Sequence, residues 1–168
     1  MKFLLSLLLL CTAASLSAQI EWLSWEEAIV RNEREPRKLL VDVYTDWCGW
    51  CKHMDKTSFR EPAVVAYVSE NFYAVKLDAE QEETITFDGH DFAYDPTVGR
   101  RGVHSLAVAL LDGRMSYPSI VYLDDEQKRI TISPGFKEGP QLLRELTYVG
   151  GDHFKSTTFQ DYVEATGE

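Results

Sequence analysis

The sequence contains little cysteine: three of its 168 residues, Cys11, Cys48 and Cys51. Small exported domains with a weak core are usually held together by several disulfides. Three cysteines cannot form such a framework, so the chain must rely on a hydrophobic core. The usual four zinc ligands are also missing, because no second Cys-x-x-Cys and no paired His-x-x-x-His accompanies Cys48 and Cys51. We therefore expect neither a disulfide scaffold nor a metal site.

Positive charge is also scarce. Lys and Arg total 17 against 27 Asp and Glu, which gives a formal net charge of −10. An acidic chain is repelled by nucleic acid and by anionic membrane surfaces. The Arg100-Arg101 pair is too small to reverse this balance, so we expect neither nucleic acid nor membrane as a partner.

The sequence has no apolar run long enough to cross a bilayer, since the stretch at 3–10 is too short. That stretch follows a single positive charge and precedes small residues ending at Ala18, the arrangement of a secretory signal peptide. We expect residues 1–18 to be this signal and residues 19–168 to be one exported domain without a membrane span. A lipid anchor at Cys11 is disfavoured, because a bulky leucine stands where such a signal has a small residue.

Helical and strand patterns alternate along the chain, as in an α/β protein. Ser24 and Glu27 predict a capping box for a helix that Pro36 ends. The run from Lys38 to Tyr44 is a continuous stretch of mainly apolar residues rich in β-branched side chains, as in a strand buried on both faces. It places Asp42 inside the fold, where a carboxylate must be protonated or partnered. Further elements are expected as helices at 51–57, from 62, at 103–111, from 140 and around 159–163, and as strands at 72–78, 119–123 and 128–132.

Residues 84–94 predict a β-hairpin ahead of the helix expected at 103–111. The dipeptide Asp88-Gly89 between alternating residues is a strong turn signal, and its register places Ile85 opposite Phe92. One face of the hairpin is then apolar and needs cover, because an isolated hairpin is marginal. We expect this face to pack on its own domain; a partner surface is the alternative.

The motif that carries chemistry is Trp47-Cys48-Gly49-Trp50-Cys51, which follows the buried strand. If a helix starts here, the i, i+3 spacing brings both sulfurs within disulfide range. The helix N-terminus would stabilise the Cys48 thiolate, the species that attacks a disulfide, and Cys51 could resolve the mixed disulfide. A structural disulfide would close a loop too short to constrain much of the unfolded chain. Redox chemistry is the preferred interpretation, and a structural disulfide or half of a zinc site is the alternative.

Several short motifs together carry a resemblance to a known family. They are Trp-Cys-x-x-Cys-Lys at 47–52, Thr57-Ser58-Phe59, Pro62, Asn71-Phe72 before Lys76-Leu77-Asp78, and Tyr117-Pro118. With them the chain resembles the thioredoxin family, in particular exported members related to the C-terminal domain of the transmembrane thiol:disulfide interchange protein. The resemblance implies a thioredoxin-like fold: a central mixed β-sheet flanked by helices, with the hairpin inserted before the cis-proline helix and strand.

The resemblance also implies roles for single residues. Cys48 matches the attacking thiol and Cys51 the resolving thiol. Asp42, six residues before Cys48, matches the buried acid that accepts or relays the proton of the resolving thiol. Pro118 matches the cis-proline that faces the disulfide. The residues implied to contact the substrate are Trp47, Gly49, Trp50, Tyr117 and Pro118.

The implied function is that of an exported thiol:disulfide oxidoreductase, expected in the bacterial periplasm. It would exchange electrons with protein disulfides, be recharged by an upstream thiol donor, and need no cofactor beyond the Cys48–Cys51 couple. The buried acid favours a reductase; an oxidase or isomerase is the alternative with the same chemistry. A non-catalytic thioredoxin-fold binding module is the alternative of a different class. Gly49-Trp50 replaces the family's usual Gly-Pro, which leaves the reduction potential open.

The segment from Glu80 to Met115 is longer than in plain thioredoxin, and partner specificity could reside there. If the hairpin docked near the helix at 103–111, its tip would lie on the side of the substrate groove. Within that helix, His104 is expected at the surface rather than as a ligand.

Overall fold

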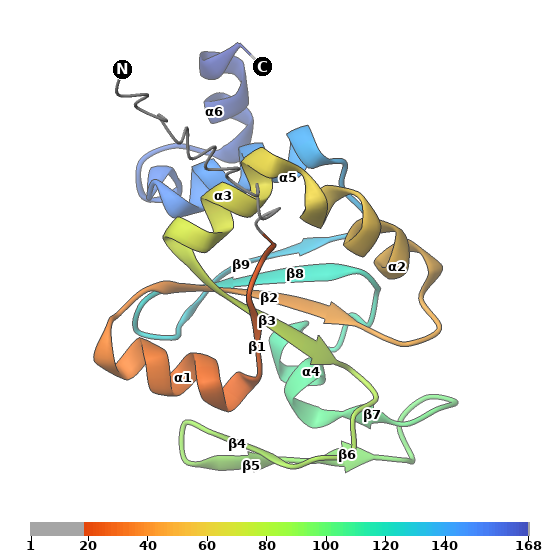
Figure 1. Cartoon of the computed structure of the whole chain (residues 1–168). Coiled ribbons are helices and arrows are strands. Elements are labelled where there is room, and N and C mark those ends of the chain that lie inside the picture. The colour runs from red at the N-terminus through yellow and green to blue at the C-terminus, as the bar shows by residue number, and fades with distance from the viewer. Residues whose placement is uncertain (1–18, 168) are drawn as a thin grey trace, which may run out of the picture.

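The computed structural model describes residues 19–167 and contains a five-stranded mixed sheet with helices on both faces (Figure 1). Its strand order is β1-β3-β2-β8-β9, in which β3 runs parallel to β1 and β2, while β8 is antiparallel to β2 and β9. The expected signal peptide at 1–18, with Cys11, lies outside the described residues. The strands of the sheet are β1 (Trp22–Leu23), β2 (Lys38–Tyr44), β3 (Phe72–Asp78), β8 (Ser119–Leu123) and β9 (Arg129–Pro134).

Helices α2, α3 and α5 cover one face of the sheet, and α1 and α4 cover the other (Figure 1). Because strand residues alternate between faces, Leu40 and Ile120 join the core under α3 and α5, whereas Leu39 and Val121 join the core on the other face. No helix within residues 19–167 has the length and apolar content to cross a membrane. The helices are α1 (Trp25–Arg34), α2 (Gly49–Lys56), α3 (Pro62–Asn71), α4 (Ser105–Leu110), α5 (Gly139–Gly150) and α6 (Phe159–Thr166), with short 3-10 turns η1 (Ser58–Arg60) and η2 (His153–Lys155).

The local sequence signals explain where several elements begin. Ser24 caps α1 through a capping box with Glu27, as predicted. Pro62 occupies the first turn of α3, where its missing N–H leaves no helical hydrogen bond unmade. The strand β1 was not predicted, because two residues are too few to show a period.

The helix predicted at 103–111 is wrong at its start. Val103–His104 forms the short strand β7, which pairs with β6 (Tyr94–Asp95), and α4 begins only at Ser105. His104 is fully buried and not at the surface. Its ring caps α4: Nδ1 accepts the Leu106 N–H at 3.3 Å, and Nε2 lies 3.0 Å from the Glu83 carbonyl oxygen.

The hairpin has the predicted register, with β4 (Ile85–Phe87) paired to β5 (His90–Phe92). It packs on its own domain, as expected: Ile85 is buried in the core, and Phe87 contacts Trp25 of α1 edge-to-face at 4.9 Å. The expected position of its tip is wrong. Figure 1 shows the turn of the hairpin beside α1, away from the start of α2, because Phe87 docks on α1.

Candidate active site

Cys48 and Cys51 form a disulfide at the start of α2. Cys48 is the N-cap residue of this helix, and its sulfur accepts the Cys51 N–H at 3.1 Å. The two residues are only 5% and 2% exposed, so little of the disulfide reaches solvent. After reduction, the same N–H and the helix dipole would favour the Cys48 thiolate. Among the described residues, no three His, Cys, Asp or Glu side chains converge as a metal site.

Two exposed tryptophans border the disulfide: Trp47 is 53% exposed and Trp50 is 62% exposed. The rings of Trp47 and Tyr117 pack edge-to-face with their centres 5.9 Å apart. The ring centres of Trp50 and Phe136 are 5.2 Å apart. Within residues 19–167, a Cβ at Gly49 would have no neighbour within 4 Å, so the surface between the tryptophans is open. Phe136 was not predicted as part of this rim, since it lies 85 positions after the motif in sequence and meets it only through the fold.

Pro118 follows a cis peptide bond, as the resemblance implied. The next residue, Ser119, pairs with Val43, so Pro118 lies beside the end of β2 that leads to the cysteines. The Pro118 carbonyl accepts the Gly135 N–H at 2.8 Å, which joins it to the end of β9. Burial raises the pKa of Tyr117 to about 12, so its phenol remains protonated at neutral pH.

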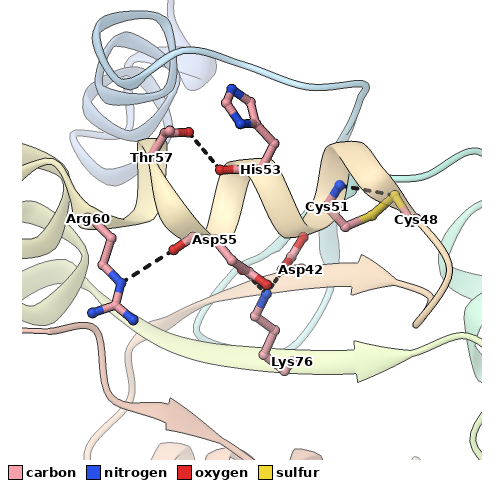
Figure 2. Close-up of polar contacts among 8 residues, drawn as sticks. All are labelled: Asp42, Cys48, Cys51, His53, Asp55, Thr57, Arg60 and Lys76. Carbon is pink, nitrogen blue, oxygen red and sulfur yellow. Dashed lines mark hydrogen bonds and ion pairs between the residues drawn. A yellow bond between two sulfur atoms is a disulfide. The ribbon is translucent and has the colours of Figure 1, made fainter.

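Asp42 lies within β2, and its side chain is 2% exposed, as predicted for a strand buried on both faces. Its Oδ2 pairs with Lys76 Nζ at 2.5 Å across the parallel β2–β3 ladder. Among the residues that the structure describes, its Oδ1 has no hydrogen-bond partner. Figure 2 shows the carboxylate beneath α2, on the side of the helix that carries Cys51.

Burial raises the pKa of Asp42, and the Lys76 charge opposes that rise. Such an acid can take up or return a proton near Cys51.

Lys76 and Asp55 were not predicted as site residues, although both contact the site. Lys76 Nζ also pairs with Asp55, which lies on α2 (Figure 2). A sequence signal for Asp55 exists: it lies four residues after Cys51, and i, i+4 positions share one face of a helix. Lys76 follows an apolar run within β3, and its closeness to Asp42 requires the strand register.

The insertion contacts Trp47, the residue before Cys48, through its loops and not through the hairpin. Trp47 Nε1–H donates to Glu80 Oε1 at 2.9 Å, and the Arg101 guanidinium lies 5.7 Å from the centre of the Trp47 ring. Glu80 follows β3, and Arg101 belongs to the loop between β6 and β7. Residues before and after the hairpin therefore contact Trp47, while the hairpin turn itself lies beside α1 (Figure 1).

The sheet order, the disulfide at a helix N-terminus and the nearby cis-proline define a thioredoxin-like fold, and solved structures share it. A protein named DsbH oxidoreductase superposes with a TM-score of 0.57 and 15% identity, over 84% of this chain and 88% of its own. A putative disulphide-isomerase from Bacteroides thetaiotaomicron gives a TM-score of 0.57 and 24% identity, over 84% of this chain and 98% of its own. These likenesses confirm the predicted fold.

Residues 9–149 match the protein family described as Thioredox_DsbH, protein of unknown function (DUF255), and the chain belongs to this family. The thiol:disulfide interchange protein DsbD of Vibrio vulnificus is 30% identical over 64 residues, 38% of this chain and 10% of DsbD. The chain spans about a tenth of the length of the curated relatives it matches. The predicted resemblance to thioredoxin-like proteins is confirmed by these matches.

Proposed function

We propose that the protein is an exported thiol:disulfide oxidoreductase that reduces protein disulfides. The observation that carries the proposal is the Cys48–Cys51 disulfide, with the Cys48 sulfur at the N-cap of α2 and bonded to the Cys51 N–H. A dithiol formed here stores two electrons without another cofactor. The open aromatic surface around Trp47 and Trp50 supports a protein as the substrate, because a peptide chain can lie against exposed rings.

In the proposed reaction, the Cys48 thiolate attacks one sulfur of a substrate disulfide. The substrate S–S bond breaks, one substrate thiolate leaves, and a mixed disulfide joins the other substrate sulfur to Cys48. Cys51 then gives its proton to Asp42 and attacks the Cys48 sulfur as a thiolate. The second substrate thiolate leaves, the Cys48–Cys51 disulfide forms again, and two electrons have passed to the substrate. An upstream thiol donor returns the couple to the dithiol.

Two further features support the finer parts of this proposal. The Asp42 carboxylate lies on the side of α2 that carries Cys51 (Figure 2), and within residues 19–167 its Oδ1 has no hydrogen-bond partner, which suits a base for the resolving thiol and therefore a reductase. The pattern of a charged start, a short apolar run and small residues up to Ala18 supports export, in a bacterium to the periplasm.

Trapping of the mixed disulfide tests the roles of the two cysteines. In an insulin-reduction assay with dithiothreitol, we expect the wild-type protein to turn over and both Cys48→Ser and Cys51→Ser to lose at least about 100-fold in rate, because each lacks one sulfur of the exchange. Cys51→Ser should accumulate a covalent adduct with insulin on a non-reducing gel, and Cys48→Ser should not. Equal trapping by Cys48→Ser would reverse the assigned roles, and an inactive wild-type protein would leave a binding module.

The reduction potential of the Cys48–Cys51 couple tests the direction of electron flow. A value near thioredoxin's roughly −270 mV supports a reductase. A value near roughly −120 mV, typical of a strong oxidant, would replace the reductase by an oxidase with the same chemistry.

A further inference from the structure

Lys76 lies between two carboxylates of unequal exposure. Its Nζ pairs with Asp42 at 2.5 Å and also with Asp55 (Figure 2). The side chains of Asp42, Lys76 and Asp55 are 2%, 21% and 40% exposed, so the three form a series from the core to the surface. Because one ammonium group pairs with two carboxylates, its positive charge is shared between them.

Three aromatic rings enclose the Lys76 ammonium. Their centres lie 4.7, 5.1 and 5.4 Å from Nζ, and they belong to Trp22 of β1, Tyr44 of β2 and Phe59 of η1. Contacts with the faces of such rings favour a charged lysine. Because the rings come from three elements, they also restrict Nζ to positions within reach of both acids.

We propose that Asp55 is a positioning residue for the redox site. It pairs with the Lys76 ammonium at the same time as Asp42 does, and thereby weakens the electrostatic attraction between Lys76 and the Asp42 carboxylate. The part this plays in turnover rests on the proposed function, whereas the electrostatic effect does not. Asp55 is not a member of the Trp-Cys-x-x-Cys-Lys motif, and its contribution comes from the fold, through the register of β2 with β3 and the position of α2.

The charges around Asp42 support this sharing. Within residues 19–167, the charged groups that act on Asp42 are Lys76 from β3 and Asp55 from α2. Tyr44, on the same strand, adds a neutral phenol, and β8 places the apolar Ile120 opposite Asp42. Burial is the largest cause that raises the pKa of Asp42; Lys76 lowers it, and the negative charge of Asp55 raises it. Removal of the Asp55 charge should therefore make Asp42 a weaker proton acceptor.

Asp55 also gives Lys76 a partner in both protonation states of Asp42. When Asp42 receives the Cys51 proton, the S–H bond breaks, an O–H bond forms and Asp42 becomes neutral. Lys76 then keeps Asp55 as its counterion, so the largely enclosed ammonium is not left unpaired. When Asp42 loses the proton again, the Lys76 ammonium is already at its Oδ2.

The decisive variant is Asp55→Asn, which keeps the shape of the side chain and removes its charge. The readout is the titration of the Asp42 carboxyl carbon by ¹³C NMR in the oxidised protein. We expect the midpoint to fall by about one pH unit, the lower end of the effect of a neighbouring charge. Asp55→Glu should restore most of the wild-type midpoint. Asp125→Asn, which removes an exposed acid from the turn after β8, should leave it unchanged.

An unchanged Asp42 midpoint in Asp55→Asn would overturn the proposal, and so would an equal fall in Asp125→Asn, which would reflect only overall charge. The titration does not depend on turnover, so an inactive wild-type protein would remove the proposed function and leave this result standing. If the wild-type protein is active, the acidic limb of the pH profile of insulin reduction should move by about one pH unit in Asp55→Asn, in the same direction as the Asp42 midpoint. A shifted titration with an unshifted profile would overturn the role of Asp55 in the reaction.

Discussion

Lys76 and Lys137 are both largely withdrawn from solvent, but their partners differ in kind. Lys76 pairs with two carboxylates. Lys137 is 3% exposed, and its Nζ donates to the backbone carbonyls of residues 133–135 at 3.0 to 3.3 Å, with the Glu145 carboxylate 3.9 Å away. Carboxylates change charge with pH, whereas carbonyls do not. The pairing of Lys76 therefore changes with pH, whereas the hydrogen bonds of Lys137 to the carbonyls do not.

Lys137 holds the loop that supports the other side of the site. Gly135 in this loop donates to the Pro118 carbonyl, and Phe136 packs against Trp50. The Lys137 carbonyl itself accepts a hydrogen bond from Ser58 Oγ, just after α2. Burial lowers the pKa of Lys137, and the negative charge of Glu145 opposes that effect. A buried cation therefore stabilises the fold here by satisfying three carbonyls at once.

The largest expected effect follows from Lys137→Met, which removes the donor for these carbonyls and leaves Glu145 without its cation. We expect a loss of about 3 kcal/mol in the free energy of unfolding, because three carbonyls lose their donor and each buried unsatisfied group costs about 1 kcal/mol or more. Urea unfolding at pH 5 and pH 8 would measure it. Most of the loss should already be present at pH 5, because carbonyls do not titrate. A loss that disappears at pH 5 would place the stabilisation in the Glu145 pair and remove the contrast with Lys76.

The matched change Lys76→Met should have a smaller and pH-dependent effect. Burial raises the pKa of Asp42 in the folded state above its value in the unfolded state. The stability that comes from protonating Asp42 is therefore fully present below the unfolded-state pKa and is lost as the pH rises through the folded-state pKa. Lys76 lowers that folded pKa, so its removal raises the pKa further and enlarges the loss. We expect little cost at pH 4 and about 1–2 kcal/mol at pH 8 by urea unfolding. An equal cost at both values would make Lys76 a structural residue like Lys137.

The sequence predicted the elements better than their contacts, for physical reasons. The continuous apolar strand was enough to place Asp42 inside the fold. Its partner Lys76 depends on the register of a parallel pair, which forms between segments 34 residues apart. The hairpin register follows from its two-residue turn, but the docking of Phe87 on Trp25 depends on tertiary packing.

His104 shows how a local pattern can mislead. The apolar spacing from Val103 to Leu111 indicates a helix, but spacing alone does not reveal where the first helical residue lies. His104 caps α4 with its ring, so the helix begins at Ser105, two residues after the predicted start, and the His104 side chain is buried. Histidine is not among the strongly preferred N-cap residues, so this role could not be predicted from the residue type.

Arg101 extends the comparison to a third cation and should have the smallest effect. It is exposed, and its partner is the Trp47 ring, which neither titrates nor is buried. An exposed cation–π contact contributes about 0.5 kcal/mol, so Arg101→Gln should leave urea unfolding and insulin reduction almost unchanged. The Trp47 indole N–H, which donates to Glu80, should exchange with solvent about twofold faster by NMR, because the ring is held less firmly. Arg100→Gln is the matched control and should leave this exchange unchanged. A large fall in insulin reduction with Arg101→Gln would instead show that this loop contacts the substrate and that an exposed cation can matter as much as the two enclosed lysines.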